Sequence, residues 1–561
     1  MTGSNMAARP GGRILVDALL AQGVDHIFCV PGESYLAVLD ALHDAPIAVT
    51  VCRQEGGAAM MADAYGKLTG RPGICFVTRG PGVTNASAGI HIASQDSTPM
   101  IVFVGQVERG MRHREAFQEI AYAQVFGTMT KWAAEIDDPH RIPEFVHRAF
   151  MTAMNGRPGP VVLALPEDVL TELAEVPATP RAEPVPTSPS PAAMRRLGEM
   201  LAGASRPVMV LGGSRWSAQA VADIRRFAEA FDLPVGCQFR RQSLFDNTHP
   251  NYLGDVGIGP NPALFRRLRE ADLFLLVGGR MSEMPSSSYT LLDIPAPRQQ
   301  LVHVHPSAEE IGRVYAPALG IHADPASFAA AATALTAPAE RPWAAQTRAA
   351  NAAYRAWSDT PPPLPGRADY GRIMSWLRDR LPEDAIICNG AGNYSIWIHR
   401  FYRFRRFGTQ LGPTSGSMGY GTPAAVAAKR LNPDRMVVAF AGDGCFLMNG
   451  QEFATAVQYG LAILVIVVDN GMYGTIRMHQ EREYPGRVSA TDLTNPDFAM
   501  LARAYGGHGE TVEATEEFAP AFERAVTSGK PALIHVKVDP QAITPTATID
   551  AIRQKALAEA G

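Results

Sequence analysis

Polar side chains follow two apolar runs in the last third of this 561-residue chain. Residues 437–441 are apolar and end at Gly442-Asp443-Gly444, and residues 463–468 are apolar and end at Asp469-Asn470. Short apolar runs between turn residues predict buried strands. Parallel strands place their carboxyl ends at one edge of a sheet, where open α/β sheets bind ligands. We therefore expect Asp443 and Asn470 to meet there.

A carboxylate and an amide oxygen are hard ligands. With a main-chain carbonyl and phosphate oxygens they suit octahedral Mg²⁺, so the sequence predicts a site for a magnesium diphosphate. A Gly-Asp-Gly turn is common by itself, and it is the spacing to Asn470 that makes this one a candidate. Between the two strands we expect a helix capped by Asn449, with Glu452 at its third position and Gly460 at its end.

The first third of the chain offers a second candidate. Cys52-Arg53-Gln54-Glu55 leads from an expected strand into a helix rich in small residues. In one interpretation Glu55 only stabilises the positive end of this helix. In the other it is a catalytic group, an interpretation that rests on the family resemblance described next.

Together these patterns resemble the thiamine diphosphate (ThDP) signature, in which Gly-Asp-Gly is followed by a doublet that ends in Asn. The resemblance covers nearly the whole chain and is closest to the acetolactate synthase branch of ThDP-dependent enzymes. Further matching stretches are Val30-Pro31-Gly32-Glu33, Arg53-Gln54-Glu55 through Ala59, residues 78–85, 96–99, 104–107 and 116–119, and Gly416-Ser417-Met418-Gly419. Several blocks in the right order are more specific than any one of them.

The resemblance implies roles for individual residues. Glu55 would hydrogen-bond the aminopyrimidine ring and promote removal of the thiazolium C2 proton. Asp443, Asn470 and the carbonyl of Met472 would hold Mg²⁺. Met418, which alone would suggest only core packing, would impose the bent shape of ThDP. The remaining cofactor-binding residues implied are Asn393, Gly416, Gly442, Gly444 and Cys445, and those near the substrate are Gly32, Phe117, Gln118 and His479.

Alternating apolar strands and helical stretches predict an α/β fold with three doubly wound parallel-sheet domains. The expected domains are a pyrimidine-binding domain (1–176), a central domain (192–337) and a diphosphate-binding domain (369–561). Proline-rich linkers (177–191 and 338–368) separate them, and the second contains a surface helix near residues 347–357. In the resembling family the two ThDP-binding domains that meet come from different chains, so we expect a homodimer at least and consider a tetramer.

Composition limits the choice of partners. A net charge of −4 gives no reason to expect nucleic acid or an anionic membrane as a partner. The six cysteines are scattered without a CxxC pair, and residues 1–13 show no signal-peptide core, so we expect reduced thiols and a cytoplasmic location.

Three features leave alternatives open. The acetolactate synthase branch binds FAD in its central domain, but here Gly254-Asp255-Val256-Gly257 replaces the usual Gly-Met-His-Gly, so FAD is a doubtful second cofactor. The basic residues Arg109, Arg112, His113, Arg114 and Lys131 form either a solvated loop or a site for an anionic substrate.

His479 aligns with a tryptophan that selects the second 2-oxo acid in that branch, which predicts another acceptor, or none, and poor acetolactate formation.

The sequence thus predicts a ThDP- and Mg²⁺-dependent lyase or carboligase that decarboxylates a 2-oxo acid and can join the product to an aldehyde or a second 2-oxo acid. The alternatives are a ThDP-dependent hydrolase, a flavin-linked 2-oxo acid oxidase, or a non-catalytic subunit that binds ThDP for assembly. An intact Glu55 argues against the last.

Overall fold

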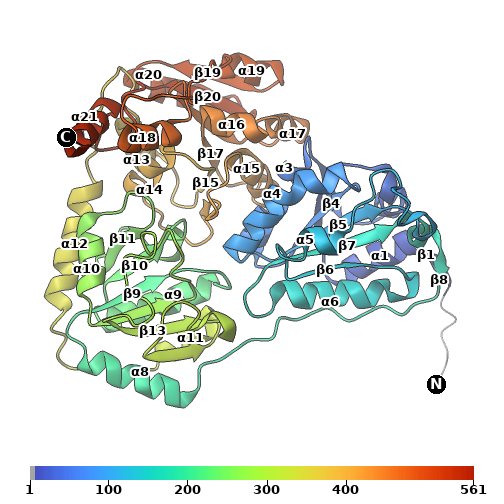
Figure 1. Cartoon of the computed structure of the whole chain (residues 1–561), viewed down its shortest axis with the longest axis horizontal. Helices are drawn as coiled ribbons and strands as arrows, with labels where there is room; N and C mark the ends of the chain where they lie inside the picture. Colours follow the sequence, from blue (N-terminus) through green and yellow to red (C-terminus); the bar gives the residue numbers. More distant parts are fainter. Residues whose placement is uncertain (1–6, 561) are drawn as a thin grey trace. The chain divides into compact units, whose positions relative to one another are not determined.

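A computed structural model of the protein describes residues 7–560. Within these residues lie three six-stranded sheets, and every neighbouring pair of strands in them is parallel (Figure 1). The predicted α/β class with three doubly wound parallel-sheet domains is confirmed. The chain divides into two compact units, one running to Val185 and including Val426–Leu431, the other formed by Pro186–Ala425 and Asn432–Gly561.

The sheet of the first unit has the strand order β3-β2-β4-β5-β7-β6. Its strands are β2 (His26–Cys29), β3 (Ala48–Val51), β4 (Gly73–Val77), β5 (Met100–Gln106), β6 (Trp132–Glu135) and β7 (Pro160–Pro166). Helices α1 (Gly11–Ala21), α2 (Leu36–His43) and α6 (Ile142–Met154) share one hydrophobic core with this sheet. Helices α3 (Glu55–Thr69) and α4 (Pro81–Asp96) pack together on its other face (Figure 1). Both faces of the parallel sheet are therefore covered, as a sheet with two apolar faces requires.

The second unit begins with a sheet in the order β11-β10-β9-β12-β13-β14. Its strands are β9 (Pro207–Leu211), β10 (Val235–Gln238), β11 (Tyr252–Val256), β12 (Leu273–Val277), β13 (Gln300–His305) and β14 (Leu319–His322). Helices α8 (Pro191–Gly203), α9 (Ala218–Ala230) and α11 (Pro325–Ala332) pack on one face and α10 (Pro262–Glu270) on the other. The chain order reverses between β9 and β12, which makes that edge a switch point.

The same unit contains the sheet β16-β15-β17-β18-β20-β19. Its strands are β15 (Ile386–Asn389), β16 (Gln410–Leu411), β17 (Val437–Gly442), β18 (Leu464–Asp469), β19 (His508–Val512) and β20 (Ala532–Lys537). Its helices include α13 (Tyr370–Arg380), α14 (Tyr394–Phe401), α15 (Gly421–Leu431), α16 (Asp443–Asn449), α17 (Glu452–Gln458), α18 (Gly474–Glu483), α19 (Phe498–Ala504), α20 (Thr515–Thr527) and α21 (Ile549–Ala560).

Two local expectations around the acidic motif are wrong. We expected a turn at Gly442-Asp443-Gly444, but Gly442 ends β17 and α16 starts at Asp443 without a connecting residue. We expected Asn449 to cap the next helix, but Asn449 is the last residue of α16, and α17 starts at Glu452 without a side-chain cap. The sequence did not reveal that one expected helix is two short ones.

The two proline-rich segments differ in their packing. Residues 175–190 contain neither helix nor strand, as expected for an extended linker. The second segment contains α12 (Ala344–Ser358) at the expected place. Trp343 and Tyr354 of that segment are buried in the core of the central sheet, so it is not only a linker. The domain boundaries themselves stay predictions.

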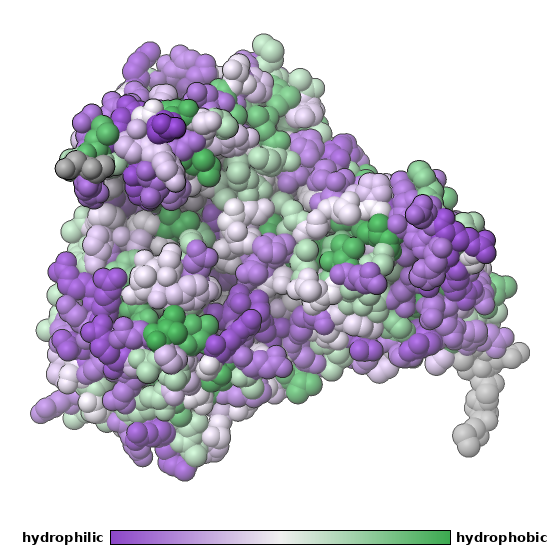
Figure 2. All heavy atoms as spheres, viewed as in Figure 1, coloured by the Kyte–Doolittle hydropathy of each residue, from purple (hydrophilic) through white to green (hydrophobic). Residues whose placement is uncertain are grey.

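The surface agrees with the composition of the chain. Hydrophilic and hydrophobic residues are interspersed over the face shown in Figure 2. Among residues 7–560, no helix is long and apolar enough to cross a membrane. All six cysteines are buried and outside any disulfide bond. The cytoplasmic location stays a prediction, and residues 1–6 of the segment on which it partly rests lie outside the described residues.

Candidate active site

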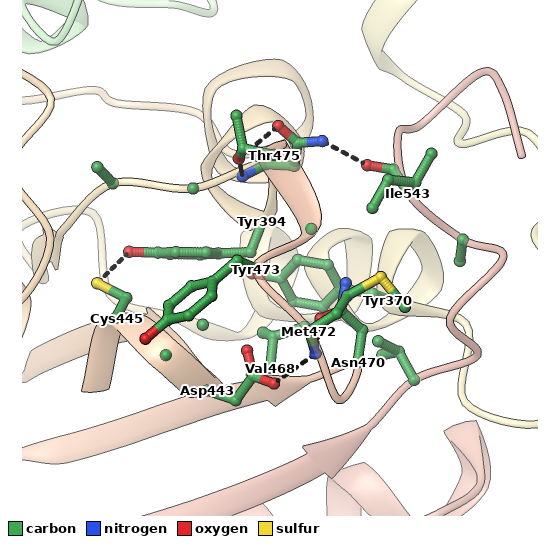
Figure 3. Close-up of a pocket in the computed structure, with 18 of the residues that line it drawn as sticks. Tyr370, Tyr394, Asp443, Cys445, Val468, Asn470, Met472, Tyr473, Thr475 and Ile543 are labelled. Carbon is green, nitrogen blue, oxygen red and sulfur yellow. Dashed lines mark hydrogen bonds between the residues drawn. The ribbon is translucent and has the colours of Figure 1, made fainter. Parts of the chain in front are cut away.

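The predicted metal ligands lie together at the carboxyl ends of β17 and β18. These strands pair in parallel, with Gly442 opposite Val468. The main-chain N–H of Met472 donates to Asp443 Oδ2 at 3.2 Å and to Asn470 Oδ1 at 3.3 Å (Figure 3). One main-chain N–H therefore links the two side chains, which come from neighbouring strand ends.

Asp443 is buried, and the Met472 N–H that donates to it carries no charge. Its Oδ2 also accepts from the amide of Asn495 at 2.8 Å, and the same amide donates to Asp469 at 2.8 Å. Burial, with a contribution from the neighbouring Asp469 carboxylate, raises the pKa of Asp443 to about 6. A buried carboxylate next to a second one is stabilised by a cation. The carboxylate, the Asn470 amide oxygen and the Met472 carbonyl are the oxygen donors that Mg²⁺ prefers, so these residues fit the ion.

A cavity of about 240 Å³ opens at this edge of the sheet (Figure 3). The predicted metal ligands and the predicted cofactor-binding residues other than Glu55 line it, namely Asn393, Gly416, Met418, Gly442, Asp443, Gly444, Cys445, Asn470 and Met472. These residues come from the loops that follow β15, β16 and β18 and from the junction of β17 with α16, because all four parallel strands end at this edge.

Aromatic side chains also line the cavity, and most of them were not predicted from the sequence. Tyr370, Tyr394, Trp397 and Tyr473 line it, and the Tyr394 hydroxyl lies 3.4 Å from Cys445 Sγ (Figure 3). Tyr370 and Trp397 have ring centroids 5.6 Å apart. No motif marks Tyr370, because it precedes β15 and reaches the cavity only through the position of α13.

Asn393 joins three segments of the cavity wall. Its Oδ1 accepts from the Thr475 hydroxyl at 2.9 Å, and its Nδ2 donates to the Ile543 carbonyl at 3.0 Å (Figure 3). Its own N–H donates to the Thr475 hydroxyl at 3.1 Å. The loop after β15 is thereby tied to the start of α18 and to the segment after β20. Sequence reasoning expected Asn393 to donate to a phosphate, and that role stays a prediction.

Glu55 lies in the first unit as the first residue of α3. The preceding Gln54 caps this helix by accepting from the N–H of Gly57, which fixes the backbone at Glu55. Glu55 is half-buried, and its Oε2 accepts from the amide of Asn85 at 3.0 Å. The carboxylate is thus held in place and remains accessible.

The predicted substrate residues of the first unit are more exposed. The Phe117 side chain is 72% exposed, and Gln118 has a φ of 66°, in the left-handed region. Gly32 packs closely on Thr78, since a Cβ at position 32 would lie 2.5 Å from the Thr78 Cβ. This contact explains why position 32 is a glycine, and the substrate role of the three residues stays a prediction.

Of the basic residues considered for an anionic substrate, Arg109 and Arg112 form ion pairs. Arg109 contacts Asp168 at 2.7 Å and Glu172 at 2.6 Å, and Arg112 pairs with Glu135. Lys131 donates to the Asn155 carbonyl at 2.6 Å. These contacts favour a structural role over capture of an anionic substrate.

His479 is exposed and is absent from the lining of the cavity among the described residues. Thr475 and Ile476 of the same helix line the cavity instead. Arg477, two residues before His479 on the same helix, donates to Glu481 at 3.0 Å. The role predicted for His479 stays a prediction.

The switch point of the central sheet shows whether a flavin fits. A Cβ on Gly213, after β9, would lie 1.8 Å from the carbonyl oxygen of Gly278, after β12. A Cβ on Gly212 or Gly279 would lie 1.9 or 2.0 Å from Gln238 Oε1, and the Gln238 amide donates to the Arg280 carbonyl at 2.7 Å. Packing within the protein thus accounts for these glycines. Since a side chain of the protein fills the space between the loops, they do not fit a flavin phosphate, and we assign no step to FAD.

Comparison with known proteins agrees with the geometry. Residues 9–125 match the thiamine pyrophosphate enzyme N-terminal TPP binding domain, residues 194–332 the central domain, and residues 390–536 the C-terminal TPP binding domain. Over 535 residues the chain is 32% identical to the acetolactate synthase isozyme 2 large subunit of Escherichia coli K12, covering 94% of this chain and 95% of that protein. The chain belongs to the thiamine pyrophosphate enzyme family.

Two other relatives extend the comparison within this family. The acetolactate synthase large subunit of Parasynechococcus marenigrum is 34% identical over 546 residues, covering 94% of this chain and 87% of that protein. The probable acetolactate synthase large subunit of Methanocaldococcus jannaschii is 30% identical over 553 residues, covering 95% and 93%. The predicted family and its ThDP cofactor are confirmed, and the chain is an enzyme of the acetolactate synthase type.

Proposed function

We propose that this enzyme decarboxylates a 2-oxo acid with ThDP and Mg²⁺ and can join the product to an aldehyde or a second 2-oxo acid. The observation that carries the proposal is the contact of Met472 with both Asp443 and Asn470 in a cavity of a ThDP-family domain. Bound ThDP supplies a nucleophilic carbon and an electron sink for cleavage of the bond next to the carbonyl.

Different residues would hold the metal, support the shape of the cofactor and transfer the proton. Asp443, Asn470 and the Met472 carbonyl would hold Mg²⁺ and, through it, the diphosphate. Met418 lines the cavity and would support the bent shape of the cofactor. Glu55, fixed by Asn85 and by the capped start of α3, would hold the proton that the aminopyrimidine ring exchanges.

We further propose that the active form is at least a homodimer. In the first unit the large apolar side chains of Leu36, Met111, Phe117 and Val125 are 61%, 47%, 72% and 45% exposed. Large apolar side chains that are exposed in one copy are candidates for burial against a second copy. Mass photometry with and without ThDP tests this, and a monomer under both conditions at micromolar concentration would contradict it.

A panel of 2-oxo acids tests the function. Each acid is incubated with the enzyme, ThDP and Mg²⁺, with and without aldehydes, and carbon dioxide, oxygen uptake and products are measured. The proposal expects carbon dioxide release from at least one acid without oxygen uptake. Oxygen uptake coupled to decarboxylation would favour the oxidase, and ThDP binding without any turnover would favour the non-catalytic subunit.

A further inference from the structure

A buried arginine of the central sheet reaches the two loops that line the candidate cofactor cavity. Arg240 lies between β10 and the next short helical turn, and it is 1% exposed. Its guanidinium donates to the carbonyl of Gly390 at 2.7 Å and to the carbonyl of Pro413. No sequence motif singled out this residue.

The two acceptors belong to cofactor-binding loops. Gly390 begins the loop after β15 that contains Asn393, and Pro413 precedes Gly416 and Met418 in the loop after β16. Both loops line the cavity. A single side chain therefore fixes the separation of two segments that are 23 residues apart in the sequence (413 minus 390).

The surroundings hold Arg240 in one position. Its guanidinium lies 4.6 Å from the centre of the Phe239 ring, and a Cβ at Gly412 would come within 2.9 Å of Arg240 Cδ. Gln242, two residues further on, is also held in place, because its N–H donates to Gln410 Oε1 at 2.7 Å and its amide donates to the His399 carbonyl at 2.8 Å. The guanidinium is therefore preorganised.

Two costs argue that the charge itself matters. Burying a guanidinium is unfavourable, because the charge loses its hydration. Arg240 also has a φ of 59°, in the left-handed region that glycine adopts with less strain. A neutral side chain would avoid the desolvation, and only glycine would avoid both costs.

The charge lies close behind the cavity wall. A Cβ at Gly390 would lie 2.5 Å from Cys445 Sγ and 3.2 Å from the Tyr394 hydroxyl, and both of these residues line the cavity. The positive charge of Arg240 adds to burial in lowering the pKa of His399 to about 3, so its field extends to neighbouring groups. A diphosphate in the cavity would feel the same field.

We propose that Arg240 is a positioning residue for the cofactor, which fixes the two loops and places a positive charge behind the wall that receives the diphosphate. The proposal rests on the cofactor site assigned above. Because attraction grows with ligand charge, Arg240 favours ThDP over thiamine monophosphate, and thiamine monophosphate over thiamine.

The test measures the affinity of the full-length protein for ThDP, thiamine monophosphate and thiamine at saturating Mg²⁺ by fluorescence quenching. Arg240→Gln removes the charge but keeps an N–H donor, and Arg240→Lys keeps the charge. Arg241→Gln is the matched control, because Arg241 is the neighbouring arginine, is half-buried and donates to the carbonyls of Gly213 and Arg240. We expect Arg240→Gln to lower the preference for ThDP over thiamine monophosphate by about tenfold, and Arg240→Lys and Arg241→Gln to retain it.

The outcomes separate the two proposals. Equal weakening of all three ligands in Arg240→Gln, or an unchanged preference, would overturn the role of Arg240 while leaving the cofactor site intact. A wild-type protein that binds no ThDP would overturn the cofactor site and the role of Arg240 with it. If Arg240→Gln does not fold, Arg240→Lys decides: a retained preference supports the proposal and a lost preference overturns it.

Discussion

The residues predicted to act on the cofactor fall in two regions that differ in how deeply their side chains are buried. In the diphosphate-binding region, nine predicted residues line one cavity, and Asp443 is 3% exposed. In the region around Glu55, the carboxylate is half-buried and Phe117 is 72% exposed. A fixed ionic ligand needs a preorganised and desolvated site, whereas a group that acts on a substrate must stay accessible. The comparison therefore assigns cofactor retention to the first region and proton transfer to the second.

The largest expected effect tests the proton-transfer region. Glu55→Gln should lower turnover by about 10²- to 10⁴-fold, the range for a positioned proton-transfer group, equivalent to about 3 to 5 kcal/mol. ThDP affinity should change little, because Glu55 is remote in sequence from the diphosphate cavity. Steady-state kinetics and ThDP titration measure the two effects. Near-native turnover in the variant would remove Glu55 from the mechanism.

The second effect concerns cofactor retention. Asp443→Ala should weaken Mg²⁺-dependent ThDP binding by about 100-fold or more, since loss of a group that only supports a metal ligand already costs about 10- to 100-fold. Asp492→Asn is a suitable control, because its side chain is 80% exposed. Calorimetry with and without Mg²⁺ measures the change. Equal ThDP affinity of wild type and Asp443→Ala would refute the metal assignment.

A third effect concerns the stability of the diphosphate-binding region. The buried Glu481 on α18 accepts from Arg553 on α21 at 2.6 and 2.7 Å, and from Arg477 and the N–H of Gly486. Chiefly because of Arg553, the pKa of Glu481 falls from 4.5 to about 2. A lowered carboxyl pKa adds stability that is complete above the unfolded value of 4.5 and is lost as the pH falls to about 2.

Glu481→Gln should therefore destabilise the protein at pH 7 by about 3 kcal/mol, the order expected for breaking a buried pair. Its thermal midpoint should approach that of the wild type as the pH falls from 5 to 2. Glu483→Gln on the same helix, an exposed position, serves as the control. A difference in midpoint that stays constant over this pH range would contradict the assigned role of the carboxylate.

The smallest effect distinguishes two residues of α18. Ile476 lines the cavity and is 55% exposed, whereas His479 is exposed outside it. Ile476→Ala should change the ratio of kcat/KM between 2-oxo acids of different side-chain length by about threefold, less than for a fully enclosed methyl group. His479→Ala should leave this ratio and the product distribution unchanged. A larger shift in His479→Ala would support the alignment that places His479 beside the acceptor.

Much of the cofactor region could be predicted from the sequence, because the patterns that mark it are local. An apolar strand that ends in Gly-Asp-Gly and a second one that ends in Asp-Asn fix the positions of Asp443 and Asn470, since parallel strands must end at one edge. The boundaries of α16 and α17 could not be predicted from the sequence, because two short helices and one longer helix have the same spacing of apolar residues.

The sequence by itself determined the α/β class, the family, the two ThDP-binding regions and the chemistry of the metal ligands, because these depend on residue type and on spacing along the chain. Only the tertiary structure decided that Tyr370 and Trp397 line the cavity, that Asn393 ties three segments together, and that Arg240 reaches two loops from another sheet. These contacts join residues far apart in sequence. Their geometry follows from the packing of whole elements, and no local pattern records it.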